Sequence, residues 1–403
     1  MKKSLFAIAA VTAFAGAAQA QSSVTVYGIL DVGYIGSNTR GFTGDPAVST
    51  KTTANSFGNS AESTSRLGFR GTEDLGGGLS AFFTVEVALQ PNTQGTSTSG
   101  NGPIAGNRQT FAGLGKKGWG NFSVGTQYTP IHTAISATSA GQQNNMVGDV
   151  IYPIAPGNNG NVGGGTFGTT TAGTTGSSGN TAAYTVRTNN MLKVQTDNFA
   201  GFVGTAFYSM ADSNSTSAGA VSATNTTGEN NKNGWGLGVN YTWKKLLVSA
   251  NYQAMKAVQA NNTTVGVWTD TATASNIKDN QWYAAATYDF GILKAYAQYI
   301  NRKATSDLNS SNFASRTAQQ LGVRSFITPK IEGWASLGNG RYDSYGTTAP
   351  TVNFTGYQLG SNYWLSKRTN LYAIFGSTQQ SSANVSQPSS GANNYALGMR
   401  HTF

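Results

Sequence analysis

The sequence has no cysteine, only two histidines and few charged residues, which make up 10% of the chain. Without cysteine there is no thiol nucleophile and no thiolate metal ligand. His132 and His401 are not spaced as metal ligands are, and no motif such as Gly-x-Ser-x-Gly marks an activated serine. We therefore expect no catalytic residue, no metal and no cofactor.

Long apolar runs are absent beyond the beginning of the chain. Lys2 and Lys3 precede a short apolar stretch that ends in the small-residue site Ala18-Gln19-Ala20. This order is typical of a secretory signal peptide. We expect residues 1–20 to be that signal and residues 21–403 to form one exported domain without a helical membrane anchor.

Acidic residues are scarcer than basic ones, 16 against 26, which gives a formal charge of +10, or +8 without Lys2 and Lys3. The lysines and arginines are scattered singly along the chain and form no runs. Nucleic-acid surfaces cluster their basic residues, so we expect no nucleic-acid partner.

In many segments of the sequence, apolar and polar residues alternate with a period of two residues. In the stretch 63–90, Arg66 and Arg70 alternate with apolar residues, a glycine turn follows at 76–78, and a second alternating arm carries Glu86. Similar segments recur to the end of the chain, and no stretch shows a convincing apolar period of 3.6 residues. The pattern predicts an all-β protein built from hairpins.

The connections between these segments alternate between short and long. Seven tight turns and eight long connections predict about sixteen strands in an antiparallel up-and-down barrel, with both termini at the short-turn end. The long connections are expected at Ser37–Glu62, Pro91–Asn107, Ile131–Ala183, Ala211–Lys232, Gln259–Asp279, Ala304–Ser315, Asp343–Asn353 and Gln380–Ala392.

Alternation alone does not distinguish a soluble sandwich from a membrane barrel, because both have one apolar and one polar face. Aromatic residues such as Trp243, Phe290 and Trp364 stand at strand ends beside the short turns. Aromatic belts at the two membrane interfaces have this placement. Together with export and the absence of disulfides, it favours a transmembrane barrel in contact with outer-membrane lipid.

The polar strand faces would line a water-filled interior. Parity places six cations and three acids there: Arg66, Arg70, Lys193, Lys294, Arg324 and Arg400, with Asp31, Glu86 and Asp289. In a narrow aqueous passage such an excess biases permeation toward anions, although each residue could equally be a solvated side chain. Arg108 is ambiguous, because strict alternation puts it on the apolar face unless a bulge intervenes.

The connection Ile131–Ala183 is about twice as long as its neighbours. Long loops in compact proteins are usually functional. If this loop folds inward, it narrows the pore with Asp149 facing wall arginines across a gap. If it lies outside, it is surface decoration. We expect the inward arrangement.

Five stretches then carry a family resemblance: SVTVYGILD at 23–31, SRLGFRGTEDLGGGL at 65–79, YDFG at 288–291, LSKRTNLY at 365–372 and GMRHTF at 398–403. With them the chain resembles the Gram-negative general porins of the neisserial and betaproteobacterial type, over nearly all of its mature length. The resemblance implies a homotrimer of sixteen-stranded barrels, each with its third loop folded into the pore, that passes small hydrophilic solutes and ions by diffusion.

The resemblance also assigns roles to residues. Arg66 matches a wall arginine of the constriction, Glu86 an inward glutamate, and Phe403 part of the signal read by the outer-membrane assembly machinery. Family members often have Gly-Arg-Gln where this chain has Gly125-Thr126-Gln127, and an additional arginine pair is common where it has Asn107-Arg108. A thinner cationic cluster and weak anion preference are therefore expected.

We accordingly expect an outer-membrane diffusion porin, not an enzyme, with Arg66, Arg70, Glu86, Lys193, Arg324 and Asp149 in the pore. Two alternatives remain open at this point. One is a barrel that acts mainly as an adhesin or receptor through loops such as Ser213–Asn231. The other is a barrel hydrolase, which would need a histidine held by a carboxylate near one rim.

Overall fold

The computed structural model describes residues 23–42, 49–92, 103–154, 181, 183–215, 228–259, 276–311, 313–344, 351–382 and 389–403. The expected signal peptide lies outside these residues. The strands are β1 (Ser23–Phe42), β2 (Ser49–Asn59), β3 (Arg66–Gly76), β4 (Leu79–Leu89), β5 (Ile104–Lys116), β6 (Gly120–Tyr128), β7 (Arg187–Thr196), β8 (Phe202–Ser215), β9 (Gly228–Trp243), β10 (Leu246–Gln259), β11 (Ile277–Asp289), β12 (Lys294–Ser306), β13 (Phe313–Thr328), β14 (Ile331–Ser344), β15 (Val352–Trp364), β16 (Thr369–Gln380) and β17 (Ser390–Thr402). One helix, α2 (Pro130–Thr138), follows β6.

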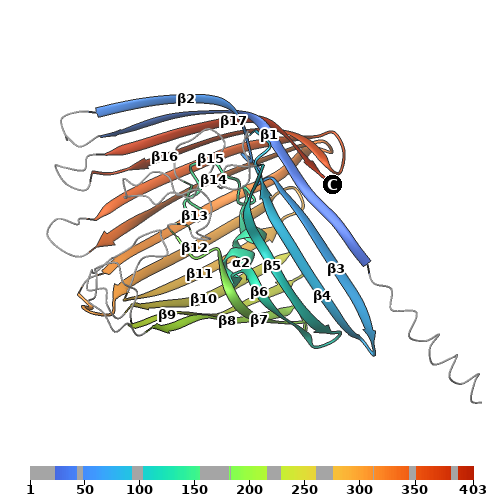
Figure 1. Ribbon diagram of the computed structural model, residues 1–403. Helices are drawn as coiled ribbons and strands as arrows, with labels where there is room; N and C mark the ends of the chain where they lie inside the picture. The colour runs from blue at the N-terminus through green and yellow to red at the C-terminus, as the bar shows by residue number, and fades with distance from the viewer. Residues whose placement is uncertain are drawn as a thin grey trace, which may run out of the picture.

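The strands form one closed antiparallel sheet (Figure 1). From β3 to β17 each strand pairs with its neighbours in sequence, and β1 closes the ring by pairing with β17 from Ile29 opposite Thr402 to Arg40 opposite Gly391. On its other edge β1 pairs with both β3 and β2, so these two segments are one barrel strand with an interruption. The barrel therefore has sixteen strands, as the hairpin pattern predicted.

The interruption at residues 60–65 arises from Asp31 on β1. One carboxylate oxygen of Asp31 accepts hydrogen bonds from the backbone N–H groups of Glu62 at 2.9 Å and Ser63 at 2.6 Å. The segment that carries these two donors is not paired in the sheet, and Ser60 at its start adopts a positive φ of 65°. The expectation of one long loop at Ser37–Glu62 was wrong in extent, because β1 continues to Phe42 and β2 lies within that range.

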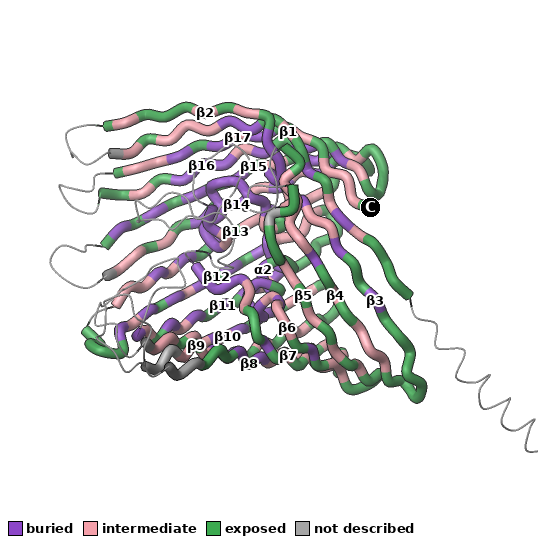
Figure 2. The backbone as a smooth tube through the Cα atoms, viewed as in Figure 1, coloured by how far each residue is buried: buried purple, intermediate pink, exposed green. Residues whose placement is uncertain are grey.

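Buried and exposed residues alternate along the strands (Figure 2), and the apolar residues are the exposed ones, unlike in a water-soluble protein. Leu321, Leu337 and Leu359 on the outer face are 68%, 66% and 53% exposed, whereas the alternating Gln320, Gln358 and similar residues are buried inside. A soluble sandwich would bury these leucines. The apolar faces thus point outward to lipid and the polar faces inward, which distinguishes the two readings of the alternation.

Helix α2 is a short addition to a fold that is otherwise β, as the alternation predicted. Thr129 is its N-cap and accepts a hydrogen bond from the N–H of His132, and Pro130 occupies the first turn, where its missing N–H is harmless. Ile131, Ala134 and Ile135 then form a buried stripe. The segment is too short to stand out by periodicity. In the described part of the chain, no helix is long and apolar enough to cross a membrane.

Candidate pore site

The chain after β6 enters the barrel interior, and we call residues 130–154 the inner segment. Helix α2 contacts the inward faces of β9 to β12. Thr138 shares a hydrogen bond of 2.5 Å with the hydroxyl of Tyr283, which is itself buried and inward. Figure 1 shows α2 within the ring of strands.

The rest of the inner segment crosses β13 to β16. Gln358 on β15 donates from Nε2 to the carbonyl oxygens of Met146 at 2.8 Å and Val147 at 2.9 Å, and its Oε1 accepts from Asn144 at 2.9 Å. Glycine on the neighbouring strand makes room, since a Cβ at Gly376 would lie 1.8 Å from the Val147 oxygen. The segment is therefore seated closely on the wall.

Three wall arginines hold backbone carbonyls of the same loop. Arg324 donates to Ala140 at 2.7 Å, Arg316 to Val150 at 2.6 Å and Arg302 to Thr181 at 2.8 Å. Arg324 is also paired with Glu332 and Arg302 with Asp279, so their charges are balanced. These arginines act as tethers for the loop, because their donors are directed at its carbonyls.

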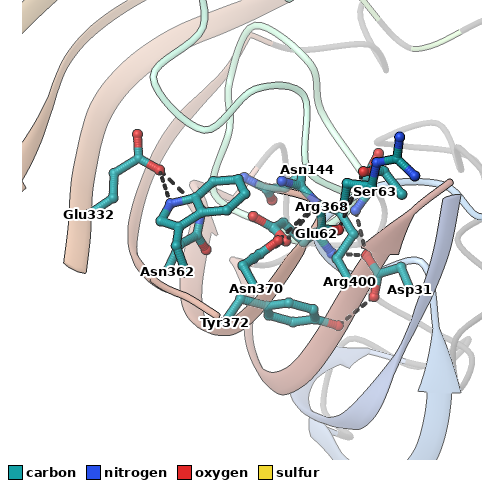
Figure 3. Close-up of polar contacts among 12 residues, drawn as sticks. Asp31, Glu62, Ser63, Asn144, Glu332, Asn362, Arg368, Asn370, Tyr372 and Arg400 are labelled. Atoms are coloured by element: carbon teal, nitrogen blue, oxygen red, sulfur yellow. Dashed lines mark hydrogen bonds and ion pairs between the residues drawn. The ribbon is translucent and has the colours of Figure 1, made fainter. Parts of the chain in front are cut away.

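The middle of the inner segment reaches the break between β2 and β3. Asn145 donates to the carbonyl of Ser60 at 2.7 Å and to the hydroxyl of Thr64 at 3.0 Å. Figure 3 shows the polar network behind this contact, in which Asn370 donates to Glu62 at 2.9 Å and Tyr372 donates to Asp31 at 2.6 Å. The strand break therefore provides a docking point for the inner segment.

A cationic cluster lies on the strands β3, β4 and β5. Glu86 pairs with Arg108 at 2.8 Å and with Arg66 at 3.9 Å, and its other oxygen accepts from the Tyr27 hydroxyl. Arg108 points inward because the β4–β5 register shifts at Glu86–Val87 and again at Val87–Leu89. The bulge settles the ambiguity left by strict alternation.

Arg187 at the start of β7 completes this cluster. It stacks over the Tyr128 ring at 6.0 Å, as Arg108 also does, and donates to the Arg108 carbonyl at 3.5 Å. Among the described residues it has no carboxylate within ion-pair distance. Arg66, Arg108 and Arg187 are therefore balanced by a single carboxylate, that of Glu86.

Aromatic rings join the cluster to the inner segment. His132 packs on Tyr128 with ring centroids 4.4 Å apart, and its Nδ1 is 3.0 Å from the Tyr184 hydroxyl. Burial, reinforced by the nearby guanidinium groups of Arg187, Arg108 and Arg66, lowers the pKa of His132 well below its ordinary value. The ring is thus neutral near pH 7, and the fixed charge comes from the arginines.

The remaining expected pore residues are placed in different ways. Arg70 is exposed and stacks on Tyr27 at 5.4 Å, and Lys193 is half-buried opposite Ser123. Neither joins the cluster. Asp149 does not face a gap, because it is buried and its Oδ1 accepts from the N–H groups of Ile151 and Tyr152, both at 2.8 Å.

Sequence reasoning missed the positions of Arg187, Arg302 and Arg316. Register shifts in β6–β7 and a positive φ at Asn190 break the parity that would have placed Arg187. Arg302 and Arg316 share the parity of buried polar neighbours and could have been found by it. Arg108 and Arg187 belong to the cationic cluster, although neither was among the expected pore residues.

The chain end closes the barrel. Phe403 and Gly28 exchange two backbone hydrogen bonds of 3.0 and 3.1 Å, and the Phe403 ring covers Gly28, where any Cβ would overlap it.

Neither histidine contacts a carboxylate in the described part of the chain. Within these residues the histidine–carboxylate pair that the hydrolase alternative requires is not found. Most of the loop Ser213–Asn231, proposed as an adhesive surface, lies outside the described residues.

Comparison with known proteins agrees with this architecture. A family model for Gram-negative porins matches residues 7–383. An outer membrane porin protein of Bordetella pertussis is 30% identical over 432 residues, covering 100% of both chains. An anion-selective porin from Comamonas acidovorans has a TM-score of 0.63 at 21% identity, covering 95% of this chain and 100% of that chain. OmpT of Vibrio cholerae in a trimer form has a TM-score of 0.58 at 17% identity, covering 95% and 99%.

The family match spans most of the sequence, and the fold is that of the solved porins. Both confirm the resemblance to Gram-negative porins, the sixteen-stranded barrel and the outer-membrane location, and they exclude the enzyme alternative in favour of a channel. The chain belongs to the Gram-negative porin family of outer-membrane channel proteins.

Proposed function

We propose that the barrel passes small hydrophilic solutes and ions by passive diffusion, with a preference for anions set by Arg66, Arg108 and Arg187. The single observation that carries this proposal is that three guanidinium groups stand against one carboxylate, that of Glu86, beside the inner segment. The inner segment narrows the passage at that level, so permeating ions travel close to these charges.

Electrostatics supports a preference that is real but modest. Two unit charges about 4 Å apart interact by roughly 1 kcal/mol in water and by more beside a low-dielectric wall. The pore contains water and mobile ions, which screen the field within about 10 Å. An excess of two positive charges therefore gives a permeability ratio above one without excluding cations.

The other expected pore residues have distinct roles in this proposal. Arg70 and Lys193 add positive charge to the wall away from the cluster. Arg324 and Asp149 act on the inner segment itself: Arg324 tethers it to β13 and Asp149 fixes its turn through backbone N–H groups. Their removal would change the shape of the passage more than its potential.

Assembly completes the proposal. The protein forms a homotrimer in outer-membrane lipid, is exported by residues 1–20, and presents Phe403 to the outer-membrane assembly machinery. The position of Phe403 supports the last point, because its backbone pairing with Gly28 closes the sheet. OmpT in its trimer form has the same fold, which is compatible with trimerisation here.

Conductance in planar bilayers tests the proposal. Purified protein should produce discrete ohmic conductance steps. In a salt gradient, the reversal potential should be displaced toward the equilibrium potential of the anion. Absence of any conductance from folded, heat-resistant protein would contradict the channel function. A reversal potential on the cation side would contradict the assignment of selectivity to the arginine cluster.

A further inference from the structure

Three lysines form a row on the outside of the barrel, near the long-connection ends of β10, β11 and β12. Lys256 and Lys278 are direct partners across the β10–β11 pair, and Lys303 is the partner of Asn280 across β11–β12. Paired residues share a face, and so do residues two or four apart in one strand. Because Trp282, four residues from Lys278, is 56% exposed on the outer face, all three lysines point outward.

The row carries a positive excess. Lys256 and Lys278 are 46% and 56% exposed and both contact the carboxylate of Asp307, and Lys303 stacks over the Phe313 ring at 4.5 Å. Among the described residues, Asp307 is thus the one acid that contacts this row of three ammonium groups. Asp307 holds two of them close together near the long-connection ends of the strands.

Directly below this row is an apolar groove of about 860 Å³. Its outward walls include Leu237, Tyr252, Trp282 and Tyr299, and its floor includes small residues such as Ala284. Tyr252 and Trp282 pack with ring centroids 4.8 Å apart, and the Tyr252 hydroxyl donates to Asn280, between the groove and the lysines. Residues of β7 to β12 line the groove, which lies on the lipid side of the wall, whereas the arginine cluster faces the interior.

We propose that this surface is a specific site for a phosphorylated acyl lipid of the outer leaflet, with phosphate at Lys256, Lys278 and Lys303 and an acyl chain in the groove. The proposal uses the outer-membrane location of the family and the placement of the long connections on the outer side. Ammonium groups pair with phosphate as point charges, and the aromatic row sits at the depth where a headgroup meets its chains. This occupant matches both the charged rim and the apolar groove below it.

Lipid binding is measured by native mass spectrometry of the detergent-purified full-length protein with diphosphoryl lipid A as the probe. The wild type should retain one lipid per barrel at low lipid concentration. The triple substitution Lys256→Gln, Lys278→Gln and Lys303→Gln should weaken binding about tenfold or more, since each basic residue near a membrane surface contributes about 1 kcal/mol. Ala284→Phe, which fills the groove and leaves every lysine in place, should also weaken it.

Matched controls define the outcome. Lys51→Gln removes an exposed lysine at the same end of β2, and Ala112→Phe enlarges an exposed outward alanine of β5 outside the groove. Both should bind lipid as the wild type does, and an excess of inorganic phosphate should not displace the lipid. Unchanged binding in the triple variant, or in Ala284→Phe, would overturn the proposal. Equal competition by inorganic phosphate would overturn the assignment to a lipid. All variants should keep wild-type conductance, which separates this site from the pore.

Discussion

At the scale of single residues, arginine serves two purposes inside this barrel, and the neighbouring groups decide which. Arg324 has a carboxylate partner and donates to a loop carbonyl, so its charge is neutralised and its donors are used for positioning. Arg187 has rings and a carbonyl as neighbours, so its charge is available to the passage. Sequence parity detects that a side chain points inward, but it does not detect its partner.

Replacement of Arg187 by glutamine should lower the anion-to-cation permeability ratio about two- to fivefold, because one unpaired charge worth about 1 kcal/mol leaves the passage. Stability should change little, since no ion pair is broken. Reversal potentials in a salt gradient measure the effect.

Arg341→Gln is the matched control for Arg187→Gln, because Arg341 is exposed near the outer end of β14 and is paired with Asp343. The anion-to-cation permeability ratio of this variant should equal that of the wild type at moderate salt, where the charges of exposed ion pairs are screened. Equal ratios in Arg187→Gln and the wild type would remove Arg187 from the selectivity mechanism.

At the scale of elements, the inner segment is fixed mainly through its backbone. Its carbonyls accept from Gln358, Arg316 and Arg324, and its close approach to β16 depends on the missing side chain of Gly376. A segment held in this way has one position against the wall. It can set the width of the passage without a covalent link.

Substitution Gly376→Ala should displace the segment around Val147, because the new Cβ would lie 1.8 Å from a backbone oxygen. We expect a loss of about 1–3 kcal/mol in stability and a changed, noisier single-channel conductance. Single-channel recording and thermal unfolding measure both effects.

Gly41→Ala is the control for Gly376→Ala, since no atom lies within 4 Å of a Cβ built at Gly41. It should leave the conductance unchanged. If Gly376→Ala also conducts like the wild type, the inner segment does not define the passage at Val147.

The elements also show what sequence could predict. Strands and short turns followed from period-two alternation and glycine turns, because the membrane requires an apolar outer face on every strand. Helix α2, the inward direction of Arg108 and the break between β2 and β3 beside Asp31 were not predictable in that way. Each depends on a local contact that overrides periodicity: an N-cap at Thr129, a bulge in β4–β5, and a carboxylate that captures two backbone donors.

At the scale of the whole molecule, the barrel depends on closure between its first and last strands. The ring of Phe403 covers Gly28 at this seam while its backbone pairs with the same residue. Phe403→Ala should therefore lower the fraction of assembled barrel, with a loss of about 1–2 kcal/mol of apolar contact. The fraction of heat-resistant protein in outer membranes measures it.

Phe326→Ala is the control at this scale, because Phe326 is an exposed aromatic residue at the short-turn end of β13, away from the seam. It should assemble better than Phe403→Ala. Equal assembly of both variants would show that Phe403 acts only as one more residue of the aromatic belt.

The whole molecule combines an apolar exterior, a closed sheet and an interior in which arginines outnumber acids beside the inner segment. Selectivity is the property that depends on all three. The most direct test is the reversal potential of the wild type in a planar bilayer with a gradient of potassium chloride. A potential displaced toward the equilibrium potential of chloride, and reduced in Arg187→Gln, is the predicted result, and a potential displaced toward that of potassium would contradict the central claim.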